Sequence, residues 1–190
     1  MDQSGFRIRI VEQGWRNPDV PEDFRSIGLI NLVIGGQQIL TADDDQFGIS
    51  EAGLALLRTL EFDYDPDEER WKPIPHGCGL LVMMGCPIGA HWRVRHDGDI
   101  VAISDVVHFP TASETDQVSF GDLTVKVPFS EYENEVVAFA RNARTMFGAA
   151  PFPDHQNIEF LTMDDHIAPW RDFLDEYDHR LAQHTTGRPL

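Results

Sequence analysis

The sequence predicts an α+β fold, with one antiparallel sheet of about six or seven strands covered on one face by about three helices. Two turn pairs and the order of the elements support this class. Gly35-Gly36 and Asp97-Gly98 are typical of two-residue hairpins, because such turns require positive φ angles. Segments with the period of strands lie mostly before residue 129, and the chain after it is helical in pattern. This separation favours a sheet with helices on one side rather than alternating units.

The first strand is expected at residues 6–11, where apolar and basic side chains alternate with the period of a half-buried strand. Residues 28–40 form a hairpin about the two glycines. A helix is expected to start at Ser50, whose hydroxyl would cap the first free N–H groups. Ile49 and Leu54 would pack as a hydrophobic staple beside that cap.

The middle of the chain combines a loop, a strand and a second hairpin. Residues 61–77 are rich in proline and acidic side chains, which indicates a long loop. The apolar run 79–84 predicts a central strand buried on both faces. Residues 91–107 fold about Asp97-Gly98, with Arg93 and Arg95 on the face opposite the apolar side chains. The expected pairs are His96 with Asp99, Val94 with Val101, and Trp92 with Ile103.

The C-terminal part begins with a strand at residues 123–127 and then becomes helical. Ser130 and Glu133 match a capping box at the start of a helix that runs to Met146. A last helix is expected from about Pro169 to Ala182. Its apolar stripe would face the core and its acidic side would face solvent.

Length and composition predict one domain spanning residues 1–190. The chain is 42% hydrophobic, which is typical of a globular protein. Its two cysteines, Cys78 and Cys86, are too few for a disulfide framework and are expected to be reduced thiols. We expect a cytoplasmic protein, because the sequence shows neither a signal peptide nor an apolar run long enough for a membrane helix. The oligomeric state is not predicted.

Charge is the strongest compositional signal. Thirty-two acidic residues against fifteen lysines and arginines give a formal net charge of −17. A field of this sign repels phosphate backbones and anionic lipids, so we expect neither nucleic acid nor membrane as a partner. It favours rapid association with a basic protein.

Motifs for cofactors and metals are missing. The only two lysines, Lys72 and Lys126, do not follow glycine-rich turns into helices, so no phosphate-binding or dinucleotide motif is present and no cofactor is predicted. The acidic run that starts at Asp63 lacks the glycine and the final glutamate of a calcium loop. Five potential zinc ligands lie within 21 residues, but their spacing matches no standard zinc pattern, and no metal site is predicted. They are His76, Cys78, Cys86, His91 and His96.

Acidic loops are the predicted functional surface. Carboxylates on two loops, together with a tryptophan beside one of them, would contact a basic partner. The predicted partner-binding residues are Asp43, Asp44, Asp45, Asp63, Asp65, Asp67, Glu68, Glu69 and Trp71. No catalytic residue is predicted.

Several segments of the sequence resemble small acidic bacterial immunity proteins of toxin–immunity systems. They are the alternating start 6–10, Trp15, the stretch 27–29 before the glycine hairpin, and the segment 92–99. The resemblance covers about half of the chain and implies a non-enzymatic protein that binds and neutralises a toxin. It carries over no individual binding residue.

The leading hypothesis is therefore an immunity or antitoxin-type protein that covers a basic site on its partner. The first alternative is a hydrolase, or a domain that binds a small molecule or metal, centred on Cys86, His91 and His96. Cys86 follows an apolar run, and a nearby histidine is the usual activator of such a nucleophile. The second alternative is an adaptor subunit of a larger assembly.

Overall fold

The structure is a computed structural model that describes residues 5–15, 25–69, 71–77, 86–147 and 163–185, with backbone only for residues 114 and 163–170. Nine strands and three α-helices occur in these ranges. The strands are β1 (Phe6–Trp15), β2 (Ser26–Ile34), β3 (Gln37–Leu40), β4 (Phe47–Gly48), β5 (Ile74–Pro75), β6 (Gly89–Asp97), β7 (Ile100–Phe109), β8 (Val118–Ser119) and β9 (Val125–Pro128). The helices are α1 (Ile49–Arg58), α2 (Phe129–Phe147) and α3 (Met163–Gln183), and a short 3-10 turn spans Glu114–Asp116.

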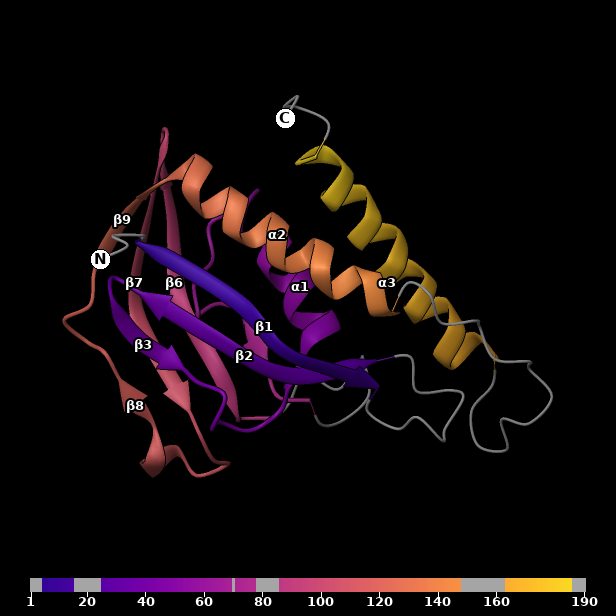
Figure 1. The fold of residues 1–190 in the computed structure, drawn as a ribbon, viewed down its shortest axis with the longest axis horizontal. Helices are drawn as coiled ribbons and strands as arrows, with labels where there is room; N and C mark the ends of the chain where they lie inside the picture. The colour runs from indigo at the N-terminus through magenta and orange to yellow at the C-terminus, as the bar shows by residue number, and fades with distance from the viewer. Residues whose placement is uncertain (1–4, 16–24, 70, 78–85, 148–162, 186–190) are drawn as a thin grey trace.

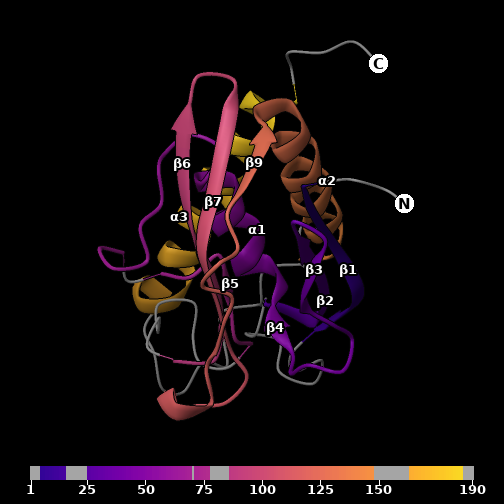
Figure 2. The ribbon, with the colours of Figure 1, turned by 90° about the vertical axis from the view of Figure 1, so that its left-hand side faces the viewer.

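The α+β class with antiparallel strands is confirmed, but the strands form two sheets instead of one. The first sheet has the order β1-β2-β3, with β4 also paired to β2, and the second has the order β5-β6-β7-β8, with β9 also paired to β7. β4 leads directly into α1, which lies between the two sheets (Figure 2). The second hairpin therefore belongs to a sheet of its own.

Aromatic side chains join the two sheets at the centre of the molecule. The Phe6 ring on β1 lies 5.8 Å from the Trp92 ring on β6 and 4.7 Å from the Tyr132 ring on α2. All three residues are fully buried. One hydrophobic cluster thus includes residues from both sheets and from the helices.

Helix α3 packs on the outer side of α1 and α2 (Figure 1). Tyr177 is fully buried, and its hydroxyl donates a hydrogen bond of 2.8 Å to the carbonyl of Ala140 on α2. At the rim, Arg58 of α1 binds the Glu176 carboxylate with two hydrogen bonds of 2.8 and 2.7 Å. Arg144 of α2 binds Asp178 in the same bidentate way. Part of the acidic side of α3 is therefore paired, and Asp172 and Asp175 remain exposed.

The predicted cap of α1 is wrong. The helix begins at Ile49 with Gly48 as its N-cap and without a side-chain cap. Ser50 is buried inside the first turn, where its hydroxyl accepts a 3.3 Å hydrogen bond from the Ser26 N–H and donates one of 2.7 Å to Glu51. Because this hydroxyl connects α1 to β2, a contact distant in sequence overrides the local capping preference.

The two hairpins differ in how closely they follow the prediction. Gly35 and Gly36 both have positive φ, 57° and 79°, as expected for a type I′ turn. In the second hairpin Asp97 pairs with Ile100, so the turn residues are Gly98 and Asp99 rather than Asp97 and Gly98. Only Gly98 has positive φ, 61°, which fits a type II′ turn with glycine first.

This shift changes the partner of each residue but keeps its face. His96 pairs with Val101 and Val94 with Ile103, instead of Asp99 and Val101. The apolar side chains remain buried on one face, and Arg93 and Arg95 lie on the other as predicted.

The C-terminal helices occur where expected, with different bounds. Helix α2 starts one residue before Ser130, and its predicted stripe is buried at Tyr132, Val136, Phe139 and Ala143. Helix α3 begins at Met163, several residues before the predicted start. The strand expected at 79–84 lies outside the described residues. In the described part of the chain, no helix combines the length and the apolar character needed to cross a membrane.

Gly53 allows α3 to approach α1 closely, since a Cβ at this position would lie 2.0 Å from the Tyr177 hydroxyl oxygen. We expect Gly53→Ala to lower the free energy of unfolding by about 1–3 kcal/mol, because the alanine overpacks the contact. Helix propensity alone would change stability by about 1 kcal/mol in the opposite direction. Urea denaturation measures the sign. In a chain that also carries Tyr177→Phe, Gly53→Ala should destabilise the protein less, because the hydroxyl is gone. A Gly53→Ala substitution that stabilises the parent chain would contradict this packing.

Glu176 predicts a pH-dependent contribution to stability. Hydrogen bonds from Arg58, and then from Arg180, lower the pKa of Glu176 from 4.5 to about 2, against the opposing effect of burial. Its stabilisation is complete above the unfolded value of 4.5 and declines as the pH falls toward 2. Glu176→Gln should lower the free energy of unfolding by about 1–3 kcal/mol at neutral pH. The difference in free energy of unfolding between Glu176→Gln and the parent chain should become smaller as the pH falls. A difference that stays constant from neutral pH downward would contradict the ion pairs.

Candidate functional site

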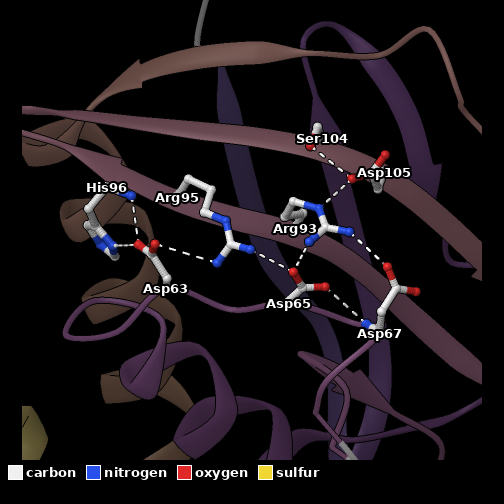
Figure 3. Close-up of polar contacts among 8 residues, drawn as sticks. All are labelled: Asp63, Asp65, Asp67, Arg93, Arg95, His96, Ser104 and Asp105. Carbon is white, nitrogen blue, oxygen red and sulfur yellow. Dashed lines mark hydrogen bonds and ion pairs between the residues drawn. The ribbon is translucent and has the colours of Figure 1, made fainter.

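Two arginines on the solvent-facing side of β6 organise the acidic loop that follows α1 (Figure 3). Arg93 binds three carboxylates: Asp65 through Nη1, Asp67 through Nη2 at 2.9 Å, and Asp105 through Nε at 2.6 Å. Arg95 binds Asp65 at 2.6 Å and lies 3.5 Å from Asp63. Three of the residues predicted to bind a partner protein therefore lie across the sheet and bind its arginines.

Asp65 is the centre of this network. Its side chain is only 10% exposed, and it receives hydrogen bonds from both guanidinium groups. A carboxylate this far from water requires compensation by charge and hydrogen bonds. Its second oxygen accepts a 3.1 Å hydrogen bond from the Asp67 N–H, which turns the loop back on itself.

A bulge in β7 directs the fourth carboxylate. Asp105 and Val106 together oppose Trp92, because the register shifts between His91 and Arg93 on β6. Asp105 has a φ of 51°, and among the described residues it is the one non-glycine residue with positive φ. Bulges reorient side chains in this way, and aspartate tolerates the left-handed conformation. The hydrogen bond from Arg93 lowers the pKa of Asp105, so its carboxylate stays ionised.

Asp63 holds the other end of the loop through His96. The Oδ1 atom of Asp63 accepts a 2.8 Å hydrogen bond from the His96 N–H and lies 3.0 Å from Nδ1 of its ring. Burial raises the pKa of Asp63, but the hydrogen bonds from His96 outweigh it and the net shift is downward. This contact fixes the loop at the hairpin end of β6.

Backbone and aromatic contacts complete the attachment. Tyr64 and Val94 exchange two backbone hydrogen bonds of 3.0 and 2.9 Å, which form an isolated bridge to β6. The Tyr64 hydroxyl donates a 2.7 Å hydrogen bond to the carbonyl of Trp71, and the two rings lie 4.4 Å apart. Trp71 is half-buried against the core and connects this segment to β5.

The structure brings five of the nine predicted binding residues onto one surface, together with Asp105. We call this surface the acidic face; its carboxylates are Asp63, Asp65, Asp67, Asp105, Glu68 and Glu69. Glu68 and Glu69 are exposed, and within the described residues no hydrogen bond or ion pair engages either carboxylate. The sequence analysis placed Arg93 and Arg95 on the outer face of the hairpin but did not predict that they bind the carboxylates of the acidic loop. Their position on that face was the signal that could have indicated this pairing.

The other predicted loop, between β3 and β4, is a separate unit. Asp44 accepts hydrogen bonds of 2.5 and 3.1 Å from the N–H and hydroxyl of Thr41, and lies 3.8 Å from His108. Burial lowers the pKa of His108, against the effect of Asp44. Asp43 is exposed, and Asp45 contacts His76 at 3.0 Å. No hydrogen bond or ion pair described here joins this loop to the acidic face.

The proposed cluster of Cys86, His91 and His96 does not form. His96 binds Asp63, and His91 packs against the Phe109 ring with 5.3 Å between ring centroids. Cys86 instead lies 3.5 Å from Nδ1 of His76, and Cys78 lies outside the described residues. In the part of the chain that the structure describes, no three histidine, cysteine, aspartate or glutamate side chains are placed to hold a metal ion.

Comparisons of the chain with protein-family models, with curated proteins and with solved structures returned no match.

Arg93 should control the order of the acidic loop. Arg93→Gln leaves Asp65, Asp67 and Asp105 close together without their shared cation, so like-charge repulsion should release the loop. We expect amide hydrogen exchange at Tyr64 to accelerate about tenfold or more. Arg93→Lys should give a smaller increase, because one ammonium cannot reproduce the three-way guanidinium geometry. Exchange at Tyr64 that stays at the parent rate in Arg93→Gln would contradict the network.

Proposed function

We propose that the chain is a non-enzymatic protein of immunity type that binds a basic partner protein through the acidic face. The observation that carries the proposal is the charge balance of this surface. Four of its six carboxylates share the two guanidinium groups of Arg93 and Arg95. Among the described residues, negative charge therefore remains after these ion pairs are formed, and Glu68 and Glu69 are its exposed edge.

The order of this face favours binding. Carboxylates on a free loop lose conformational entropy when a partner immobilises them, which reduces affinity. Here the arginines and the Tyr64–Val94 bridge already hold the loop on β6. A partner meets a fixed array of acceptor oxygens, including Asp67, whose side chain is 83% exposed. Lysine or arginine side chains of the partner would bind these oxygens directly.

The net charge acts at longer range. A chain of formal charge −17 attracts a basic protein before contact, and this raises the association rate at low salt. The acidic face then determines the orientation of the encounter, because it gathers negative charge on a loop that the arginines hold in place. Association by this mechanism weakens as salt shortens the Debye length.

A pair of double variants tests the role of this face separately from total charge. Glu68→Gln with Glu69→Gln removes two charges from the acidic face, and Asp172→Asn with Asp175→Asn removes two from α3. Each version is immobilised and exposed at low and high salt to lysate from cells of its source. We expect the parent and the α3 variant to retain one basic protein at low salt. With that protein purified, the face variant should associate about tenfold more slowly.

Two results would count against the proposal. Equal loss of association in both double variants would show that only total charge matters. An association rate that does not change with salt would exclude electrostatic steering.

A further inference from the structure

A second group of side chains, distinct from the acidic face, surrounds the described cysteine. Nδ1 of His76 lies 3.5 Å from Sγ of Cys86, and Nε2 of the same ring lies 3.0 Å from Oδ2 of Asp45. The three residues come from the β3–β4 loop, the end of β5, and the segment before β6. Their order in space is therefore thiol, imidazole and carboxylate.

Backbone contacts fix the position of the imidazole. His76 forms an isolated antiparallel bridge with Phe47, and the Gly77 N–H donates a 3.0 Å hydrogen bond to the carbonyl of Gln46. His76 is thereby held beside the loop that carries Asp45. Its side chain is only 17% exposed, whereas that of Asp45 is 52% exposed.

The two ring nitrogens have different roles. A carboxylate accepts a hydrogen bond, so Nε2 of His76 carries the proton that faces Asp45. Nδ1 then presents its lone pair to the thiol of Cys86 and can take its proton. A nucleophile beside a base that a third group orients is the arrangement found in activated cysteines. It is not a metal site, because Cys86 and Asp45 contact opposite sides of the ring.

Lys72 places a positive charge next to the same cysteine. Its ammonium donates a 3.4 Å hydrogen bond to the carbonyl of Cys86 and another to the carbonyl of Pro87. Burial lowers the pKa of Lys72, and the charge of Cys86 opposes this shift. The described titratable groups around Cys86 are thus His76, Asp45 and Lys72, with His91 beyond Lys72. Cys86 is half-buried, and we expect a small reagent to reach its sulfur.

We propose that Cys86 is a nucleophilic thiol that undergoes exchange with a small, uncharged disulfide. His76 takes the thiol proton at Nδ1, and the Cys86 sulfur attacks one sulfur of the disulfide. A new S–S bond forms as the old one breaks, and the leaving thiolate takes the proton back from His76. The products are a mixed disulfide at Cys86 and one free thiol, so no further oxidant is required. The net charge of −17 disfavours anionic disulfides.

The rate of adduct formation with 2-hydroxyethyl disulfide tests this inference. The full chain carries Cys78→Ser, so that Cys86 is its single thiol, and intact mass spectrometry follows the adduct at about pH 6 and about pH 8. We expect His76→Gln to slow the reaction about tenfold or more at the lower pH and less at the higher pH, where thiols ionise without a base. A purely structural role for His76 would not produce this pH dependence.

Asp45 provides a second arm with a matched control. Asp45→Asn should slow the reaction several-fold, because the ring loses the carboxylate that fixes its tautomer and stabilises its protonated form, whereas Asp122→Asn removes one exposed charge elsewhere and should not. Loss of a negative charge near a forming thiolate would by itself speed the reaction, so slowing shows that the Asp45 carboxylate acts through the His76 ring. If His76→Gln fails to fold, the comparison of Asp45→Asn with Asp122→Asn still tests the proposal. Asp45 lies on an exposed loop, so we expect its substitution to leave the fold intact. Equal rates in the parent, His76→Gln and Asp45→Asn chains would overturn the proposal.

Discussion

The burial of the Asp65 carboxylate is the constraint on which this part of the structure depends. A carboxylate with so little exposure is tolerated only with charged donors, and Arg93 and Arg95 supply them from β6. The chain after α1 must therefore cross the outer surface of the second sheet before it reaches β5. That path positions Tyr64 and Trp71 against the core and delivers His76 to the loop that carries Asp45. The acidic face, and the group formed by Cys86, His76 and Asp45, both follow from this one path of the chain across the second sheet, which the ion pairs hold in place.

Local pattern predicted most of the longer elements of the fold, because burial imposes a period on them, but it missed the two-residue strands β4, β5 and β8. The alternation at β1, the glycine turn at 35–36 and the stripe of α2 all occur where the sequence indicates. The period also located Arg93 and Arg95 on the outer face of the hairpin. It could not show which segment crosses that face. The division into two sheets depends on which strands pair at a distance in sequence, which no local pattern contains.

The candidate sites show the same division between local and distant information. Glu68 and Glu69 are exposed as predicted, since charged residues in a turn remain solvated unless a partner approaches. Asp63, Asp65 and Asp67 were predicted to bind a partner protein, and their partners within the chain were missed because these lie about thirty positions away. The same limit applied to Ser50, whose hydroxyl contacts Ser26 across two elements. It applied also to Cys86, for which His91 lies five positions away in sequence, whereas the histidine in contact with its sulfur is His76, ten positions away.

The acidity of the chain affects the two proposed activities in opposite ways. It supports association with a basic protein, and it disfavours any additional anion, including a thiolate at Cys86. Transfer of the thiol proton to His76 avoids this cost, because the resulting thiolate and imidazolium are neutral as a pair. Asp45 stabilises the imidazolium from the opposite ring nitrogen, and the Lys72 ammonium adds a cation beside the sulfur-bearing residue. In a strongly negative protein, a reactive cysteine thus requires positive charge nearby. Lys72, one of the two lysines of the chain, lies beside Cys86.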